Sequence, residues 1–122
     1  MPHMLLIIEP IGQREARTEA EGREAYAVMR RFADELTAKG LLLSAESLAS
    51  QAKAARVEVR GNKTQIVDGP FAEAKEMIGG FYLLNCDTHE EAVAIAARCP
   101  AAQWATVEVR SLAPCYDDAR SA

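Results

Sequence analysis

The sequence has few cysteines, histidines and aromatic residues, and it has no excess of basic charge. Its 3 cysteines are an odd number and form no CxxC pair, which argues against a disulfide framework and fits free thiols in a reducing compartment. Acidic residues outnumber basic ones by 18 to 14, so no basic face is available to neutralise a run of phosphates. The composition therefore argues against nucleic-acid binding and against metal or redox chemistry at the cysteines.

Long apolar segments and cofactor motifs are also missing. Residues 4–8 form an apolar run that Glu9 ends, which is too short for a signal peptide, and no segment approaches the roughly 20 apolar residues of a membrane span. The chain has no Gly-rich phosphate loop, no nucleophile elbow and no cluster of metal ligands. We therefore expect a cytoplasmic protein with no membrane partner and no metal or other cofactor.

The hydrophobic residues that are present suffice for one core. They make up 49% of 122 residues, which predicts a single domain spanning residues 1–122. Residues 4–8 do not alternate between apolar and polar side chains, which is typical of a strand covered on both faces. Tyr26, Met29, Ala33 and Leu36 recur at helical spacing and predict a helix over residues 22–39, which Gly40 ends.

The rest of the chain alternates between strand and helix signals. A second strand is expected over residues 41–48, and residues 56–60 and 63–67 alternate around Gly61-Asn62, a hairpin signal. A short helix over residues 71–77 and another doubly covered strand over residues 81–86 follow. Thr88 and Glu91 form a capping box for a second helix, which Pro100 ends, and residues 106–110 read as an edge strand.

This order of elements predicts an α+β fold of the ferredoxin-like βαββαβ type with an inserted β-hairpin. Such a fold places its first and third core strands in the centre of the sheet, and these are the two segments that lack alternation. Two helices cover only one face of the sheet. We expect a second copy of the chain to cover the other face, sheet against sheet, which predicts a homodimer.

Three parts of the sequence resemble a known family. Residues 67–76, followed by Gly79-Gly80-Phe81-Tyr82, are similar to the DGPF signature of YCII-related proteins, and residues 107–110 and 4–7 are similar to that family's closing and opening strands. The resemblance covers almost the entire chain. It implies a dimeric α+β barrel and bacterial genes that often stand beside those for extracytoplasmic-function sigma factors, but no established substrate.

The Asp68-Gly69-Pro70-Phe71 segment has two interpretations. As a turn, Asp68 accepts bonds from backbone amides, Gly69 supplies unusual dihedral angles, Pro70 starts a helix and Phe71 fills the core. As a site, Asp68 is a general base or orienting carboxylate, held by the rigid turn at the rim of a ligand pocket formed with Gly69, Pro70 and Phe71. A rigid turn suits either role.

Other polar residues are candidates for contacts with a ligand. Glu46 and Ser47 end the second strand and match a GEGL-like stretch of the family, with Ala45 and Ser47 in place of its glycines. Glu76 shares a helical face with Glu73 in the expected short helix, where paired carboxylates can divide acid and base roles or simply be solvated.

Histidine and arginine supply further candidates. Some YCII-related proteins are thought to use a His and Asp pair, for which this chain offers His3 and the more exposed His89. Arg110 and Arg56 lie on half-exposed strands and either bind a carboxylate or phosphate or stay in solvent. Trp104 and Tyr82 suit an apolar pocket as well as core or dimer packing.

Two functions fit these patterns. The first is an enzyme or binding protein for a small polar organic molecule, acting without metal or nucleotide, with Asp68 as the key polar group. The second is a non-catalytic regulatory or interaction module linked to a sigma factor. The sequence leaves open whether the protein is an enzyme.

Overall fold

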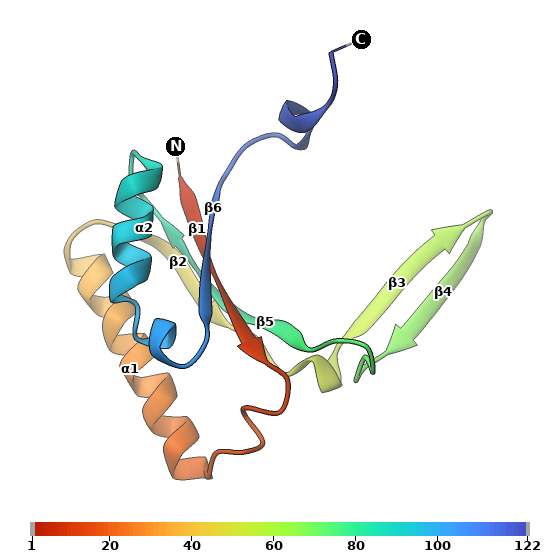
Figure 1. Ribbon diagram of the computed structural model, residues 1–122, viewed down its shortest axis with the longest axis horizontal. Coiled ribbons are helices and arrows are strands. Elements are labelled where there is room, and N and C mark those ends of the chain that lie inside the picture. Colours follow the sequence, from red (N-terminus) through yellow and green to blue (C-terminus); the bar gives the residue numbers. More distant parts are fainter. Residues whose placement is uncertain (1, 122) are drawn as a thin grey trace.

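A four-stranded antiparallel sheet with two helices on one of its sides forms the body of the protein (Figure 1). The computed structural model describes residues 2–121. The strand order is β2-β5-β1-β6, which confirms the ferredoxin-like α+β fold and the central positions of the first and third core strands. The sheet does not close into a barrel. Its elements are β1 (His3–Pro10), α1 (Glu19–Ala38), β2 (Leu42–Ser47), β5 (Glu76–Leu84), α2 (His89–Arg98) and β6 (Thr106–Ser111).

The core lies between the sheet and the helices. Leu5 and Ile7 of β1 point toward the helices and are buried. The alternate side chains of β1, Met4, Leu6 and Ile8, are only half-buried. Leu36 of α1 and Leu84 of β5 are fully buried. Within one chain the helices therefore cover a single face of the sheet, as expected from their number.

Helix α1 begins three residues earlier than expected, because Thr18 caps it. The Thr18 hydroxyl accepts a hydrogen bond from the Glu21 amide at 3.2 Å, and the Glu21 carboxylate accepts one from the Thr18 amide at 2.8 Å. Hydrogen bonding of the Glu21 carboxylate to Thr18, first of all to its backbone amide, lowers the pKa of Glu21. Thr18 and Glu21 have the same spacing as Thr88 and Glu91, so this signal was present in the sequence.

The inserted hairpin is confirmed and stands apart from the sheet (Figure 1). It consists of β3 (Ala55–Arg60) and β4 (Lys63–Asp68), and a short 3-10 helix η1 (Gln51–Lys53) precedes it. Gly61 and Asn62 both have positive φ, at 56° and 65°, as a tight two-residue turn requires. Every residue of both strands is exposed.

The prediction of a short helix over residues 71–77 is wrong, and β5 begins at Glu76 rather than at residue 81. Strand β1 continues to Pro10 and so offers a partner, since Glu76 and Met77 pair with Pro10 and Glu9. Gly79 and Gly80 lie buried inside β5, rather than between a helix and a strand. A side chain at Gly79 would collide with the Glu9 carboxylate, and one at Gly80 would come within 2.7 Å of the Glu46 carbonyl oxygen. The two glycines thus allow close packing within a strand.

The face of the sheet opposite the helices is apolar and open in the single chain. We call this the open sheet face, and it carries the half-buried or exposed side chains of Met4, Leu6, Ile8, Ile78, Phe81 and Leu83. The strands at its borders contribute polar side chains such as Glu108 and Arg110. Two more 3-10 helices complete the described elements, η2 (Pro100–Gln103) before β6 and η3 (Cys115–Asp118) after it.

Candidate functional site

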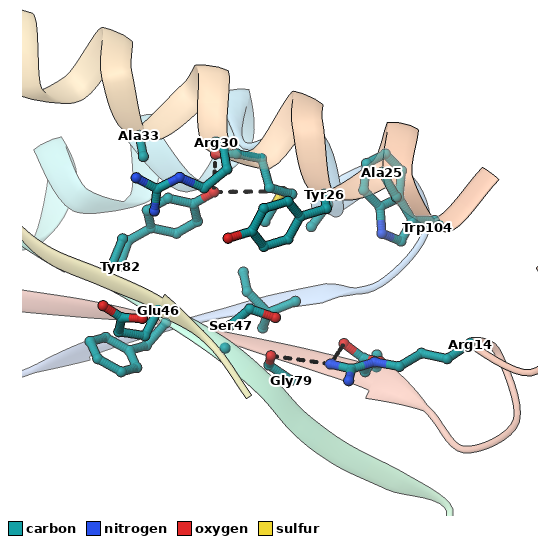
Figure 2. Close-up of a pocket in the computed structure, with 18 of the residues that line it drawn as sticks. Arg14, Ala25, Tyr26, Arg30, Ala33, Glu46, Ser47, Gly79, Tyr82 and Trp104 are labelled. Atoms are coloured by element: carbon teal, nitrogen blue, oxygen red, sulfur yellow. Dashed lines mark hydrogen bonds and ion pairs between the residues drawn. The ribbon is translucent and has the colours of Figure 1, made fainter. Parts of the chain in front are cut away.

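A cavity of about 300 Å³ lies between helix α1 and the helix-facing side of the sheet (Figure 2). The first half of α1 forms its roof, and the ends of β1, β2 and β5 form its floor. Its walls are mainly apolar and aromatic, with a few charged groups at the edge. The residues that give it its character are Glu9, Arg14, Arg17, Tyr26, Met29, Arg30, Ser47, Tyr82 and Trp104.

An ion pair between Glu9 and Arg14 closes one end of the cavity. Arg14 Nε donates to Glu9 Oε1 at 2.6 Å, and Arg14 Nη2 donates to Glu9 Oε2 at 3.2 Å. The same guanidinium donates to the carbonyl oxygens of Leu48 at 2.8 Å and Gly79 at 3.2 Å. Arg14 thereby links β1, the residue after β2 and the interior of β5, and each of its three guanidinium nitrogens donates within the protein. We assign Arg14 a structural role.

Tyr82 forms part of the inner wall. Its hydroxyl donates a hydrogen bond to the Met29 carbonyl oxygen at 2.7 Å, which ties β5 to α1. Its ring packs edge to face against Phe32 at a centroid distance of 5.5 Å. Burial raises the pKa of the Tyr82 phenol, and Arg30 opposes this effect only in part. Tyr82 is therefore a neutral hydrogen-bond donor at physiological pH.

Two arginines at the cavity edge differ from Arg14 because no carboxylate of residues 2–121 forms an ion pair with them. Arg17 lies over the Trp104 ring at 5.8 Å from its centroid, and Figure 2 shows Arg30 beside Tyr82. Neither takes part in an ion pair among residues 2–121. Tyr26, more than half exposed, lies on the same helix as Arg30. The cavity thus combines a mainly apolar interior with two arginines that form no ion pair within the described part of the chain.

Of the residues selected from the sequence, Ser47 lines this cavity, and Glu46 does so through its backbone, because it pairs with Phe81 and shares the open sheet face with it. Ser47 pairs with Gly80 at the floor, and the Glu46 backbone passes close to the same glycine. Trp104 and Tyr82, suggested for an apolar pocket, also line it.

The Asp68-Gly69-Pro70-Phe71 segment lies at the base of the hairpin, outside the cavity. A side chain at Gly69 would collide with the Gln51 carbonyl oxygen, and the Gly69 amide donates to the Ala54 carbonyl oxygen at 2.8 Å. The bond between Gly69 and Pro70 is cis. Phe71 is buried beneath the Arg56 guanidinium, which lies 3.8 Å from its ring centroid. In the single chain this segment fixes the hairpin to η1, while the Asp68 side chain stays exposed.

The structure does not bring His3, Glu76 and Arg110 to the cavity. His3 is 3% exposed at the start of β1, and its Nδ1 atom lies 3.6 Å from Cys86 Sγ. Glu76 is exposed at the start of β5, where it pairs with Pro10. Arg110 is exposed on the edge strand β6 and forms an ion pair with Glu108 at 3.3 Å. Arg110 pairs with Met4 and so lies on the opposite face of the sheet from His3, while Glu76 lies at the other end of β1.

The three cysteines are free, as expected from their number and spacing. Burial raises the pKa of the Cys86 and Cys99 thiols. Within residues 2–121, no group of three or more His, Cys, Asp or Glu side chains is placed to hold a metal ion. No helix in the same residues is long and apolar enough to cross a membrane.

Sequence reasoning missed Glu9, Arg14, Arg17 and Arg30. A signal for Glu9 was present, because the alternation of His3, Leu5 and Ile7 continues to residue 9 and places its carboxylate on the core side. A carboxylate in that position needs a partner. Nothing in the sequence, however, indicated that the polar loop after β1 folds back to supply Arg14.

Comparisons with known proteins identify a family and leave the site unassigned. The family model for the YCII-related domain matches residues 1–115. An uncharacterised protein of Rhizobium meliloti (strain 1021) is 36% identical over 93 residues, which cover 75% of this chain and 72% of that protein. The similarity therefore extends over the sheet, the helices and the cavity.

Proposed function

This chain belongs to the YCII-related family, and from that premise we propose that it binds a small organic anion in the cavity between α1 and the sheet. The anion carries an apolar body of about one ring and a carboxylate or comparable charged group. Neither a metal nor a nucleotide is part of the proposal. The observation that carries it is an apolar cavity edged by two arginines without carboxylate partners.

The size and lining of the cavity support a ligand of this class. Small-molecule sites in proteins enclose roughly 300–1,000 Å³, and this cavity, at about 300 Å³, fits the small end of that range. Met29, Tyr82 and Trp104 offer apolar surface to the body of the ligand. Arg17 and Arg30 offer planar donors that match a carboxylate. Arg14 cannot serve in the same way, since Glu9 neutralises it.

A thermal-shift series tests this proposal. We expect aromatic and branched-chain carboxylates to raise the melting temperature, and their neutral amides to raise it less. Ala25→Leu places extra volume at the cavity wall and should remove both shifts. Arg30→Gln should weaken carboxylate binding about tenfold. Arg31→Gln is the matched control, because Arg31 pairs with Glu24 on the surface. Equal shifts by acid and amide would exclude the role of the arginines, and no shift with any ligand would refute binding here.

The site predicted beside Asp68 stays a separate prediction. Asp68 is exposed in the single chain, so a second copy would have to complete any pocket there. Asp68→Asn distinguishes the two sites in the same assay. A ligand of the α1 cavity should stabilise this variant as much as the original protein, whereas loss of the shift would favour the Asp68 site.

We also propose that the protein is a homodimer in the cytoplasm. The open sheet face supports this, because a broad apolar surface in water is costly and a second copy covers it symmetrically. Leu6→Lys, in the middle of that face, should convert the dimer to a monomer in sedimentation experiments. A Leu6→Lys variant that remains dimeric would place the contact elsewhere.

The second candidate function, an interaction module linked to a sigma factor, is favoured by one observation. Val57, Val59 and Ile66 of the hairpin are exposed outside the open sheet face. Co-purification of an extracytoplasmic-function sigma factor with the protein, lost on removal of the hairpin, is the expected result. Retention of the factor without the hairpin, or its absence throughout, would count against this candidate.

A further inference from the structure

The β3–β4 hairpin, here called the hairpin arm (residues 55–68), has one apolar face. Val57 lies opposite Ile66 and Val59 lies opposite Thr64 in the register of the two strands. Residues directly opposite each other share a face, and successive residues alternate between faces. The apolar face therefore holds Val57, Val59 and Ile66, which are 61%, 56% and 62% exposed. The opposite face holds the pairs Arg56–Val67, Glu58–Gln65 and Arg60–Lys63, so it is mainly polar, with Val67 as its apolar residue.

An amphipathic ribbon of two strands is only marginally stable alone in water, because neither face is covered. The root of the arm is nevertheless firmly fixed. Gly69 packs against the backbone of η1, and Phe71 lies buried beneath Arg56 of β3. The arm is thus held in a set direction with its apolar face uncovered. This arrangement suits a ribbon whose apolar face packs on another molecule.

The position of the arm indicates which molecule its apolar face packs on. Figure 1 shows the arm projecting from the body on the side of the sheet away from α1 and α2. The open sheet face, with Leu6 and Phe81, looks toward the same side. A specific interface uses roughly 20–30 residues on each partner, more than the outward positions of four short strands supply. The arm adds its apolar residues on the same side of the molecule, and in a two-fold pair each copy contributes one arm.

We propose that the hairpin arm closes over a second copy of the chain seated on the open sheet face, with Val57, Val59 and Ile66 against that copy. The proposal rests on the homodimer proposed above. It adds that the sheet contact alone does not hold the pair at low concentration. The charged face of the arm stays in solvent.

A comparison of two double variants tests the arm. Val57→Ser with Ile66→Ser removes one cross-strand pair of the apolar face, and Glu58→Ser with Gln65→Ser removes the adjacent pair of the polar face. Both changes keep the same backbone and introduce the same residue. The dimer dissociation constant is measured for each by sedimentation velocity over a concentration series. We expect the first variant to raise it at least about tenfold, and the second to change it less than about threefold.

Each other outcome contradicts a defined part of the reasoning. If the unmodified protein is a monomer at every concentration, the homodimer fails and the arm proposal fails with it. If the protein is a dimer and the Val57 and Ile66 variant dimerises equally well, only the arm is refuted. If both double variants weaken the dimer equally, the effect comes from loss of the hairpin structure rather than from its apolar face, and the proposal is again refuted.

Discussion

The Gly79→Ala substitution gives the sharpest test of how the closed end of the cavity is built. A methyl group at this position would collide with the Glu9 carboxylate and come within 2.9 Å of Arg14 Nη2. The φ angle of Gly79 is not in the left-handed region, so the backbone itself tolerates alanine. The nearest atoms belong to the Glu9 carboxylate, so we expect the methyl group to displace this carboxylate from Arg14. The cost is therefore the cost of the ion pair.

The magnitude follows from the burial of the two partners. Charge-assisted hydrogen bonds contribute about 1.5–3 kcal/mol each. The Glu9 side chain is 11% exposed, so little water can replace Arg14, whereas Arg14 is 29% exposed and keeps its bonds to two carbonyl oxygens. The lower part of the range applies on these grounds. We expect Gly79→Ala to lower the free energy of unfolding by about 2 kcal/mol.

A double-mutant cycle with Glu9→Ala isolates this cause, because it removes the carboxylate that the methyl group meets. In that background Gly79→Ala should cost less than about 1 kcal/mol. Urea denaturation at one fixed protein concentration, followed by the fluorescence of the single Trp104, measures both values. Gly80→Ala is the control, since it meets the Glu46 backbone and should cost the same in both backgrounds. An equal cost of Gly79→Ala with and without Glu9 would refute the reasoning.

Three further predictions concern the elements around the cavity. Tyr82→Phe loses the bond to the Met29 carbonyl oxygen and should destabilise the protein by about 1 kcal/mol in urea denaturation. Because burial raises the pKa of Tyr82, its neutral form stabilises the fold below the ordinary tyrosine pKa of about 10, and this stability is lost at higher pH. Alkaline unfolding should therefore shift upward in Tyr82→Phe, and an unchanged profile would contradict this. Thr18→Ala should cost about 1 kcal/mol and speed amide exchange in the first turn of α1, while unchanged exchange would exclude a capping role. Gly69→Ala collides with the Gln51 backbone and should speed amide exchange in β3 and β4 but not in β1, whereas uniform exchange would mean that the turn does not hold the hairpin.

The sequence predicted the fold well because its signals are local and periodic. The tight turn at Gly61-Asn62, the N-cap at Thr88 and the central position of β1 each follow from neighbouring residues, and each is confirmed. At Thr88 the described bond runs from the Glu91 amide to the Thr88 hydroxyl, which is one half of the expected capping box. The error at residues 71–77 arose because helix-forming residues were judged by propensity. Pairing of Glu76 and Met77 with the end of β1 determines their conformation instead, and that contact is not visible in local sequence.

The candidate site was predicted only in part, for a related reason. Ser47 and Glu46 were found because they end a strand beside the expected pocket. The arginines were missed because they come from a loop and from the exposed side of a helix, where a surface role is the ordinary expectation. The Asp68 segment was predicted as a candidate site because a rigid turn can hold a carboxylate in place. In the structure this turn fixes the root of the hairpin and lies outside the cavity.

The loop between β1 and α1 has a consequence for the entropy of ligand binding. Arg14 fastens this loop to β2 and β5, and the Gln13 side chain donates to the Trp104 carbonyl oxygen at 2.6 Å on the other side. The loop is thus braced from both directions before any ligand arrives. A preorganised cavity of this kind loses little conformational freedom when it is filled. Calorimetric titrations should accordingly show the ordering of the ligand, rather than of the protein, as the main entropic cost of binding.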